Sequence, residues 1–451
     1  AGGGDFEDYS QLDSRIEETY VKSSSAISKS SLFNGFYRAL RWVSDYAGNK
    51  GVIALVGNSS LLDGVASVGV RLALGEEFSD VYLLNLKGDA HGYGDQRKRE
   101  GGNVFGNEAR IGIVLAVLTR TPEHEGRARI HYAEVEDYLT QDEKLGWLQT
   151  LGSMKNLQFT RVEPNKFGDW INQRSDAFTT WQPLGSKTRK PSKAPSQVFS
   201  LHTGGLQTGR DNLFYNCSPS EVAHRLKGVL AKYNASLERG EKNLPTTREA
   251  WPSRLQDFFK RGLSLKFDPD AIQDAMYRPF TKQAVYFDKT LNRRPQKLAR
   301  VFPTGRHPNL TINVTDVGSG RPFTALLTNL LPDLHLVGAG ASTQTFPLYS
   351  WDKEEGGRLP ESLPEGFPPR FNFDDSIADQ VPTRVGGYVR RDNITDETLS
   401  DYRSHYGDGK IEKEDVFFYI YAVLHHREYL EHHKEDLGKT LPRIPKCPRF
   451  W

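Results

Sequence analysis

The sequence has very few cysteines and no long apolar run. Its two cysteines, Cys217 and Cys447, lie far apart, and neither belongs to a Cys-x-x-Cys pair. This spacing argues against a disulfide framework and against a structural zinc site. No apolar run approaches the roughly 18 residues that a membrane-spanning helix needs, and no basic-then-apolar leader is present. These absences predict a protein of a reducing cytoplasm.

The chain also lacks an excess of charge of either sign. Its 59 Lys and Arg residues and 57 Asp and Glu residues leave a formal net charge of +2 over 451 residues. A surface that binds a polyanion must therefore come from local segregation of charge. At about 150 residues per domain, the length favours two or three domains.

Short apolar runs alternate with helical patterns in the first third of the chain. Residues 52–56, 81–86 and 111–119 form apolar runs, which are typical of strands that are covered on both faces. Apolar residues at three- and four-residue spacing predict a helix over 32–46, and a second helical pattern covers 64–78. The predicted fold class is therefore α/β, with helices on a sheet.

Polar residues follow the predicted strands, where α/β sheets bind their ligands. These residues are Asn58, Ser59, Asp63, Asn85 and Asp89. The rule gives a location but no chemistry. A stand-alone α/β enzyme that acts on a small molecule therefore remains one alternative.

A glycine-rich stretch, 199–216, precedes a well-signalled helix start. Its glycines permit positive φ and close backbone approach, its threonines offer hydroxyls, and its arginine can grip a phosphate or a guanine edge. A Ser-Pro-Ser-Glu sequence at 218–221 supplies an N-cap, a proline at the first helical position and a capping-box acid. The stretch suits a nucleic-acid backbone, and an ordinary glycine turn is the alternative. The candidate DNA contacts are Thr208, Gly209 and Arg210.

The segment 277–307 has the strongest basic character in the sequence. Aromatic residues alternate with its cations, and Asp288 is its one acid. We expect the aromatics to pack inward and the cations to face phosphates, because each neutralised phosphate releases counterions. A pair of strands with a basic outer face is the alternative. Arg pairs bidentately with guanine and Asn with adenine, so this segment also holds the best candidates for base readout. The candidate DNA contacts are Lys282, Asn292, Arg293, Arg294 and Lys297, of which Asn292, Arg293 and Arg294 are the candidates for base readout.

A second basic segment contains Lys187, Arg189, Lys190 and Lys193 without an acid between them. Prolines interrupt it, and such a segment is as often a solvated linker as a DNA contact. Two histidine pairs, at 425–426 and 432–433, are about two helical turns apart, which is too far for one compact metal site. We therefore expect no metal.

An ordered series of motifs resembles one enzyme family. The stretch Gly-Val-Ile-Ala-Leu-Val-Gly-Asn-Ser-Ser-Leu-Leu-Asp-Gly, residues 51–64, is similar to part of the N6-adenine DNA methyltransferases. The nearest likeness is to the bacterial type ISP restriction-modification enzymes. Further similar stretches follow in order along nearly the whole chain. They include Glu100-Gly-Gly-Asn-Val-Phe105, Gly205-Leu-Gln-Thr-Gly-Arg-Asp211, Tyr277-Arg-Pro-Phe280, Tyr286-Phe-Asp288 and Leu441-Pro-Arg-Ile-Pro445.

The resemblance implies a domain organisation and partners. Residues 1–140 would be the trailing half of a Rossmann-like methyltransferase sheet, 141–198 a connecting segment, and 199–451 an α+β target-recognition domain. By the same resemblance, Leu32 and Phe33 would line the adenine side of S-adenosylmethionine, and Asn58 would lie near the target base. The implied partners are double-stranded DNA and the missing methyltransferase half, helicase and nuclease of a longer parent chain.

Two motifs of the family are absent. The sequence lacks the loop that holds the methionine moiety of S-adenosylmethionine, and it lacks the Asp/Asn-Pro-Pro-aromatic loop that grips a flipped adenine. Its Pro368-Pro369 pair has no acceptor residue before it. The resemblance thus implies a C-terminal fragment of a bacterial cytoplasmic enzyme, with no catalytic residue for methylation and no cofactor of its own.

The leading hypothesis is that the chain supplies sequence-specific DNA recognition to an adenine-N6 DNA methyltransferase. A second hypothesis is a structural docking module that couples the helicase to the methyltransferase. The stand-alone small-molecule enzyme is the third.

Overall fold

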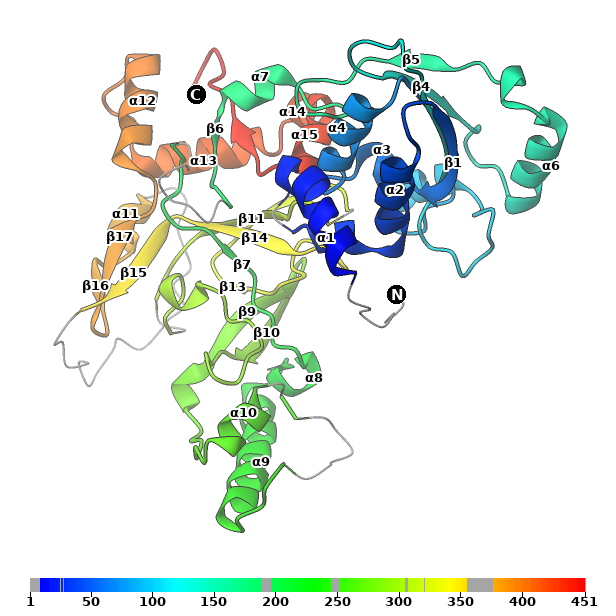
Figure 1. Ribbon diagram of the computed structural model, residues 1–451. Helices are drawn as coiled ribbons and strands as arrows, with labels where there is room; N and C mark the ends of the chain where they lie inside the picture. The colour runs from blue at the N-terminus through cyan, green and yellow to red at the C-terminus, as the bar shows by residue number, and fades with distance from the viewer. Residues whose placement is uncertain are drawn as a thin grey trace. The chain divides into compact units, whose positions relative to one another are not determined.

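A computed structural model of the protein describes residues 9–24, 26, 28–187, 196–244, 251–252, 254–304, 307–319, 321–354 and 376–450. The chain divides into two compact units, Ala1–Asp176 (unit 1) and Ala177–Trp451 (unit 2), which Figure 1 traces from blue to red. The two largest apolar clusters of unit 2 and the main cluster of unit 1 share no residue. Each unit is therefore described by itself.

The described part of unit 1 is built on a five-stranded sheet in the order β1-β3-β2-β4-β5. Strand β3 lies between β1 and β2 and is antiparallel to both, β2 and β4 are parallel, and β5 is antiparallel to β4. The three apolar runs of the sequence thus form three neighbouring strands. The strands are β1 Gly51–Asn58, β2 Asp80–Lys87, β3 Ile113–Arg120, β4 Arg129–Glu134 and β5 Thr160–Val162.

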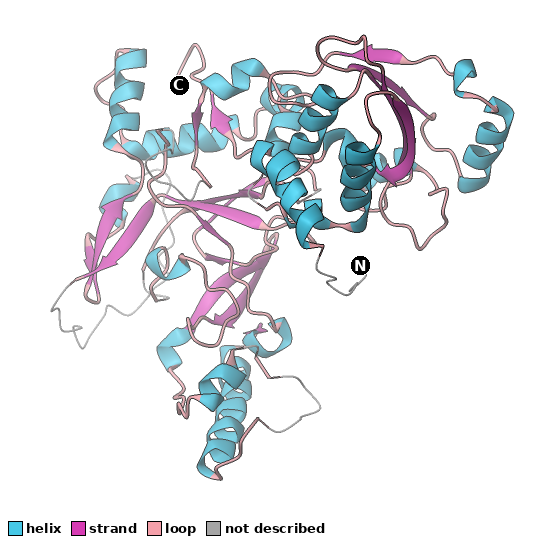
Figure 2. Cartoon of the chain, in the orientation of Figure 1, coloured by secondary structure: helices cyan, strands magenta, loops and turns pink. Residues whose placement is uncertain are grey.

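The helices that precede β2 pack on one face of this sheet (Figure 2), whereas Trp147 and Leu148 pack against Leu84 and Leu86 on the other face. Leu40 of α2 and Leu74 of α4 are buried in the same apolar cluster as Val81 of β2. Each such side chain contributes about 1.5 to 3 kcal/mol through removal from water. The helices are α1 Ser10–Ile16, α2 Gly35–Tyr46, α3 Ser60–Asp63, α4 Val68–Glu77, α5 Gly94–Glu100 and α6 Gln141–Leu151.

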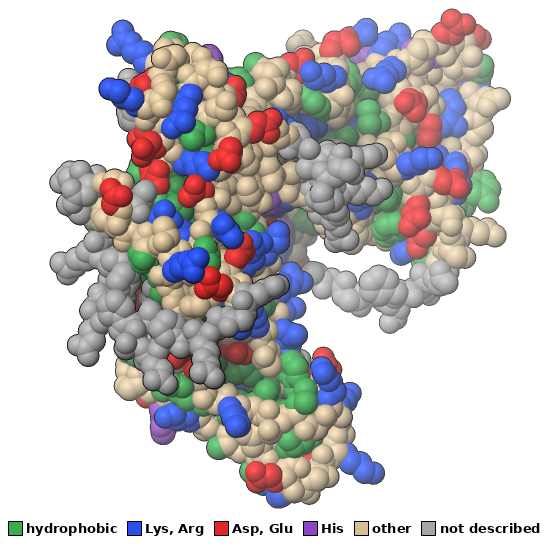
Figure 3. Space-filling view, turned by 90° about the vertical axis from the view of Figure 1, so that its left-hand side faces the viewer, with side chains coloured by type: hydrophobic (Ala, Val, Ile, Leu, Met, Phe, Trp, Pro, Cys, Tyr) green, Lys and Arg blue, Asp and Glu red, His purple; other side chains and the backbone are tan. Residues whose placement is uncertain are grey.

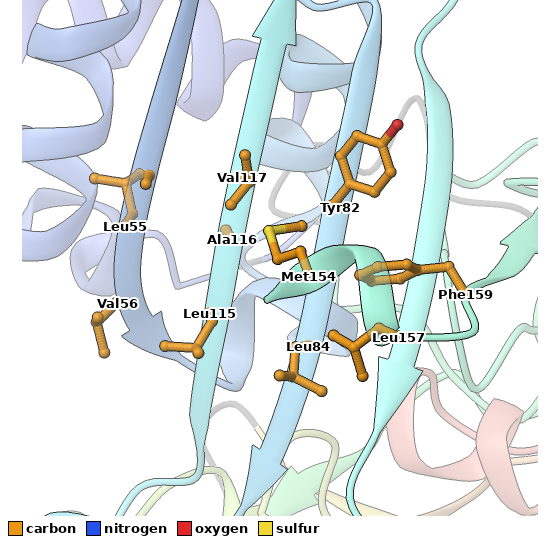
Figure 4. A pocket seen from close by; sticks show the side chains of 11 residues that line it. Leu55, Val56, Tyr82, Leu84, Leu115, Ala116, Val117, Met154, Leu157 and Phe159 are labelled. Atoms are coloured by element: carbon orange, nitrogen blue, oxygen red, sulfur yellow. The ribbon is translucent and has the colours of Figure 1, made fainter. Parts of the chain in front are cut away.

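The opposite face of the sheet is largely open around β1, which corrects the expectation that both faces are covered. Val52 and Val56 of β1 are 71% and 55% exposed. Beside them, apolar side chains of β1, β2 and β3 and of the segment 154–159 line a cavity of about 240 Å³ (Figure 4). Leu84 and Leu115 form part of its wall. Strand β1 is therefore an edge strand with an apolar, solvent-facing side.

Unit 2 contains several small sheets. Their orders are β13-β9-β10-β8, β12-β11-β14-β7, β15-β17-β16 and β18-β6. The stretch 334–337 is a turn after β13. The strands are β6 Gln182–Pro183, β7 Thr203–Gly204, β8 Tyr215–Asn216, β9 Ile272–Arg278, β10 Thr281–Tyr286, β11 Thr311–Thr315, β12 Ala325–Thr328, β13 Leu331–Pro332, β14 Thr343–Pro347, β15 Tyr349–Lys353, β16 Arg384–Val385, β17 Tyr388–Asp392 and β18 Arg443–Ile444.

The longest helix of unit 2, α9, begins where the sequence predicted. The Ser218 hydroxyl accepts a hydrogen bond from the backbone N–H of Glu221 at 3.3 Å. The Glu221 carboxylate accepts from Arg225 at 2.8 Å, so the capping box is only half formed. The helices are α7 Asp176–Thr180, α8 Asp211–Phe214, α9 Pro219–Glu238, α10 Leu255–Lys260, α11 Ile377–Gln380, α12 Asp396–Tyr406, α13 Lys413–Val423, α14 Arg427–His432 and α15 Lys434–Lys439.

The division between the units lies inside the segment 141–198, which the sequence analysis assigned to the connection. This segment contains α6, and its strand β5 completes the sheet of unit 1. Its strand β6 pairs with β18 of unit 2. The segment therefore takes part in the structure of both units. Within the described ranges, no helix is long and apolar enough to cross a membrane.

Candidate nucleic-acid interface

The glycine-rich stretch forms a loop, 203–211, which backbone hydrogen bonds to other segments hold in place (the glycine loop). The Gly205 N–H donates to the Thr343 carbonyl at 3.1 Å. A Cβ at Gly205 would lie 2.3 Å from the carbonyl oxygen of Asp333, so no larger residue fits. Gly209 has φ +78°, a region that favours glycine. The close approach predicted from these glycines thus takes place inside the protein at Gly205.

The basic segment 292–297 lies alongside the glycine loop. Gln207 and Arg294 exchange two backbone hydrogen bonds of 3.1 and 2.9 Å, which form a short antiparallel bridge. The Arg293 N–H donates to the Thr208 carbonyl at 3.1 Å. Two stretches that are distant in sequence therefore form one surface, here called the bridged face. Its members are Gln207, Thr208, Gly209, Arg210, Arg293, Arg294, Gln296 and Lys297.

Three cations of the bridged face are exposed to solvent. Arg293, Arg294 and Lys297 are exposed, and the described residues hold no ion-pair partner for them. Cations nearby are engaged instead, since Arg278 bonds Asp333 at 2.5 Å and Lys282 pairs with Asp274 at 2.7 Å. Figure 3 shows Lys and Arg side chains interspersed with acidic side chains on one face of the molecule. The three free cations are the ones available to an anionic ligand.

Asn292 is buried, unlike its neighbours Arg293 and Arg294, which corrects its assignment as a base-reading residue. Its side chain has no accessible surface. Its amide oxygen accepts from the Asp288 N–H at 2.8 Å, and its amide nitrogen donates to the Tyr286 carbonyl at 3.2 Å. Asn292 therefore fixes the turn that follows β10 and presents the two arginines.

Thr208 and Arg210 have internal roles in the glycine loop. Thr208 is 3% exposed, and its hydroxyl donates to the Asp211 carboxylate and accepts from the Arg210 N–H. These contacts set the path of the loop beside Arg293. The Thr208 hydroxyl is thus a brace, and the half-buried Arg210 lies at the border of the bridged face.

The sequence analysis missed two residues with positive φ. Gln296 follows Pro295 at φ 55°, and Phe280 follows Pro279 at φ 58°. After a proline, a turn position with positive φ normally belongs to glycine or asparagine. Gln296 is exposed, and its side chain lies across Gly204, where an added Cβ would come within 3.4 Å of the amide nitrogen. In both cases the sequence has a proline followed by a residue other than glycine, and this pair marks the turn.

A partly buried cluster of polar residues contacts the glycine loop through Asp211. The Tyr277 hydroxyl donates to Asp211 at 3.1 Å, and the Arg278 guanidinium lies 3.9 Å from the centre of the Tyr277 ring. Burial raises the pKa of Asp333, although the charge of Arg278 opposes this rise. Burial also raises the pKa of Tyr215 well above its ordinary value. The cluster ties strand β9 and the turn after β13 to the loop.

The positive charge of the bridged face also acts on a partly buried histidine, His202. Burial lowers the pKa of His202, and the charges of Lys297 and Lys187 lower it further. Lys187 thus lies within electrostatic reach of the same imidazole as Lys297, although it pairs with Asp316. The Nδ1 atom of His202 bonds the Gln344 amide nitrogen at 2.8 Å.

Comparison with known proteins identifies the family of the chain. A family model described as the Type ISP C-terminal specificity domain matches residues 197–451, more than half of the chain. The chain belongs to this family. The matched range begins just before the glycine loop and includes the whole bridged face.

Solved structures of related enzymes match the Type ISP chain over nearly its full length. One is a nuclease-deletion mutant of the Type ISP restriction-modification enzyme LlaGI in complex with a DNA substrate mimic, at 28% identity and a TM-score of 0.75 over 98% of this chain. The ATP-dependent Type ISP enzyme LlaBIII bound to DNA has 30% identity and a TM-score of 0.80 over 99%. The DrdV-DNA complex has 29% identity and a TM-score of 0.76 over 98%.

The Type ISP chain spans only part of those proteins. It covers 32% of the LlaGI chain, 27% of the LlaBIII chain and 40% of the DrdV chain. No curated protein matches the chain.

The remaining predicted DNA contacts are ion-paired or lie outside the described residues. Lys282 is on β10, paired with Asp274. Arg189, Lys190 and Lys193 fall outside the residues that the structure describes. They are therefore not placed on this surface or on any other.

The three residues assigned to a cofactor pocket lie in unit 1. Leu32 is fully buried in the core, and Phe33 is partly buried against it. The Asn58 carboxamide oxygen accepts from the backbone and the hydroxyl of Ser60. Among the described residues, no group of three or more His, Cys, Asp or Glu side chains could hold a metal ion.

Proposed function

We propose that the chain recognises a specific sequence in double-stranded DNA, as the specificity part of a Type ISP restriction-modification enzyme. The observation that supports this proposal is the bridged face. Arg293, Arg294 and Lys297 are exposed on a backbone that three backbone hydrogen bonds fix to the glycine loop. Because the backbone is already fixed, binding of an anion orders only the side chains of these cations.

The bridged face has the chemistry for both kinds of DNA contact. Lysines and arginines neutralise phosphates, and an arginine can also pair bidentately with guanine O6 and N7. The amides of Gln207 and Gln296 flank the arginines, and glutamine pairs bidentately with adenine. We assign Arg293 and Arg294 to base or phosphate contact, Lys297 to phosphate contact and Gln296 to base contact. The DNA complexes of LlaGI, LlaBIII and DrdV support a DNA ligand for this chain as well.

The test is a titration of the chain with labelled duplex at several salt concentrations. The variant Arg293→Ala/Arg294→Ala is expected to bind at least about tenfold more weakly, with the slope of log K against log salt reduced by about 1 to 2. A matched control, Arg384→Ala/Arg427→Ala, removes two exposed arginines that are ion-paired elsewhere on unit 2. The control should bind as the unmodified chain does. Equal affinity and equal salt slope in the first variant would overturn the proposal.

Unit 1 supports a second proposal, that it is the trailing half of a methyltransferase sheet within a longer parent chain. Strand β1 has a neighbour on one side only, and its outer face exposes Val52 and Val56. The related chains are much longer than this one. We propose that the missing methyltransferase half covers this face, and that helicase and nuclease parts belong to the same parent. Unit 1 then serves as the docking module of the second hypothesis.

The docking proposal predicts a defined response to charge on β1. Without a cover, the apolar face should cause the chain to self-associate at high concentration, because exposed apolar edges associate. Val52→Lys/Val56→Lys should reduce this association in sedimentation experiments and leave DNA affinity unchanged. Phe105→Lys, which changes another exposed side chain of unit 1, is the control. Unchanged association of the double variant would contradict the docking role.

S-adenosylmethionine is the methyl donor that we propose for the parent enzyme. We propose that Leu32, Phe33 and Asn58 contribute only part of its site, because Leu32 has no accessible surface and the Asn58 oxygen is bonded to Ser60. No step of methyl transfer is therefore derived from this chain.

A further inference from the structure

The tip of the β9–β10 hairpin presents one aromatic side chain to solvent. Arg278 and Thr281 pair across the hairpin, so Pro279 and Phe280 form a two-residue loop. Phe280 is 91% exposed, the highest value among the exposed large hydrophobic residues of the described chain. Its backbone has φ 58°.

Phe280 serves no purpose in the fold that the structure reveals. A bulky residue at positive φ is an outlier, and glycine or asparagine normally occupies this turn position after a proline. The ring also remains in water, so its burial cannot offset the strain. A residue that is unfavourable for two separate reasons points to a role outside the folded chain.

The hairpin tip is fixed beside the glycine loop. Next to the tip, Arg278 donates to Asp333 at 2.5 Å and lies 3.7 Å from Asp211 of the glycine loop. Tyr277 also donates to Asp211, at 3.1 Å. The strained aromatic ring is therefore held on a braced strand end, close to the loop that forms one side of the bridged face.

We propose that Phe280 stacks on a DNA base, as a wedge that enters a base step or a platform for a base outside the stack. This inference rests on the proposed function, because it needs DNA on the bridged face. An aromatic ring without charge gains affinity from DNA chiefly by stacking on the face of a base, and base–aromatic stacking tolerates any sequence. Phe280 thus supplies affinity and local distortion, while the arginines supply charge.

The test uses a duplex that the full chain selects from a random-sequence pool. Phe280→Ala should weaken binding about tenfold and leave the salt slope unchanged, because no charge is removed. Permanganate should oxidise one or two thymines of the bound duplex in the unmodified complex, and this reactivity should disappear in Phe280→Ala. Reactivity at a paired position indicates a wedge, and reactivity at an extruded base indicates a platform.

Two further variants separate stacking from a structural role. Phe280→Gly relieves the positive φ, so it should raise the thermal midpoint of the chain while losing the same affinity and reactivity as Phe280→Ala. Phe280→Trp should retain both. Phe105→Ala, another exposed phenylalanine, should change neither.

The outcomes distinguish this inference from the proposal beneath it. If Phe280→Ala binds and reacts like the unmodified chain while Arg293→Ala/Arg294→Ala is impaired, Phe280 does not stack on DNA and the proposed function stands. A ring that packs against another part of the parent protein would give that result. If the unmodified chain binds no duplex, both the stacking role of Phe280 and the proposed function are contradicted.

Discussion

At the scale of single residues, Asn292 and Arg293 are neighbours in the sequence with opposite surroundings. Asn292 is fully buried and bonds two backbone groups, whereas Arg293 is exposed and free of ion pairs within the described residues. Both residue types can read a base, so the sequence proposed both. Accessibility, which depends on the course of the turn after β10, separates them.

His307 illustrates how burial changes a residue and yields a pH prediction. Burial lowers the pKa of His307 to about 4, from the ordinary value of 6.5. Its ring nitrogens bond the Thr304 hydroxyl at 2.9 Å and the Val385 carbonyl at 3.2 Å. The folded state favours the neutral ring, so this contribution is fully present above pH 6.5 and is lost as the pH falls towards 4.

We therefore expect acid to weaken unit 2 through His307. The free energy of unfolding should fall by about 3 kcal/mol at most from this group between pH 6.5 and 4. Urea titrations across this range provide the measurement. In His307→Phe, which cannot titrate, the decline should be shallower, although the variant starts from lower stability at neutral pH. The control is the exposed His426→Phe, in which the free energy of unfolding should fall with pH as it does in the unmodified chain. If this fall is as shallow in His426→Phe as in His307→Phe, the pH dependence does not come from His307.

At the scale of elements, two short turns determine which side chains unit 2 presents to solvent. The Pro279-Phe280 turn closes the β9–β10 hairpin, and the Pro295-Gln296 turn follows the bridge between Gln207 and Arg294. Both proline turns have a non-glycine residue at positive φ. Regular elements such as α9 followed predictable patterns, whereas these turns departed from the preferred turn residue. Such departures are expected where function outweighs local preference.

The Gln296 turn gives a stability prediction. Gln296→Gly should stabilise the chain by about 1 kcal/mol, because glycine adopts positive φ without the side-chain clash. The midpoint of urea unfolding measures this change. Gln256→Gly, on helix α10, is the matched control and should destabilise by a similar amount. A loss of stability in Gln296→Gly would mean that the side chain supports the fold, and its proposed base contact would lose its basis.

At the scale of the whole molecule, the chain consists of two units with different relations to their surroundings. Unit 1 has an open sheet face on β1, and unit 2 combines several small sheets around its own cores. The membership of residues 197–451 in the Type ISP specificity family agrees with the resemblance read from ordered motifs. The α/β character of the first third was also predictable, because continuous apolar runs and helical spacing are local signals.

The sequence by itself determined the family, the main strands and helices, and the two basic or glycine-rich stretches that matter most. These features depend on residues close together in the chain. Only the tertiary structure decided that the two stretches are bridged through Gln207 and Arg294, that one face of the first sheet is open, and that Phe280 is exposed. Pairing and accessibility are set by contacts between residues far apart in sequence, whose energies no local pattern encodes.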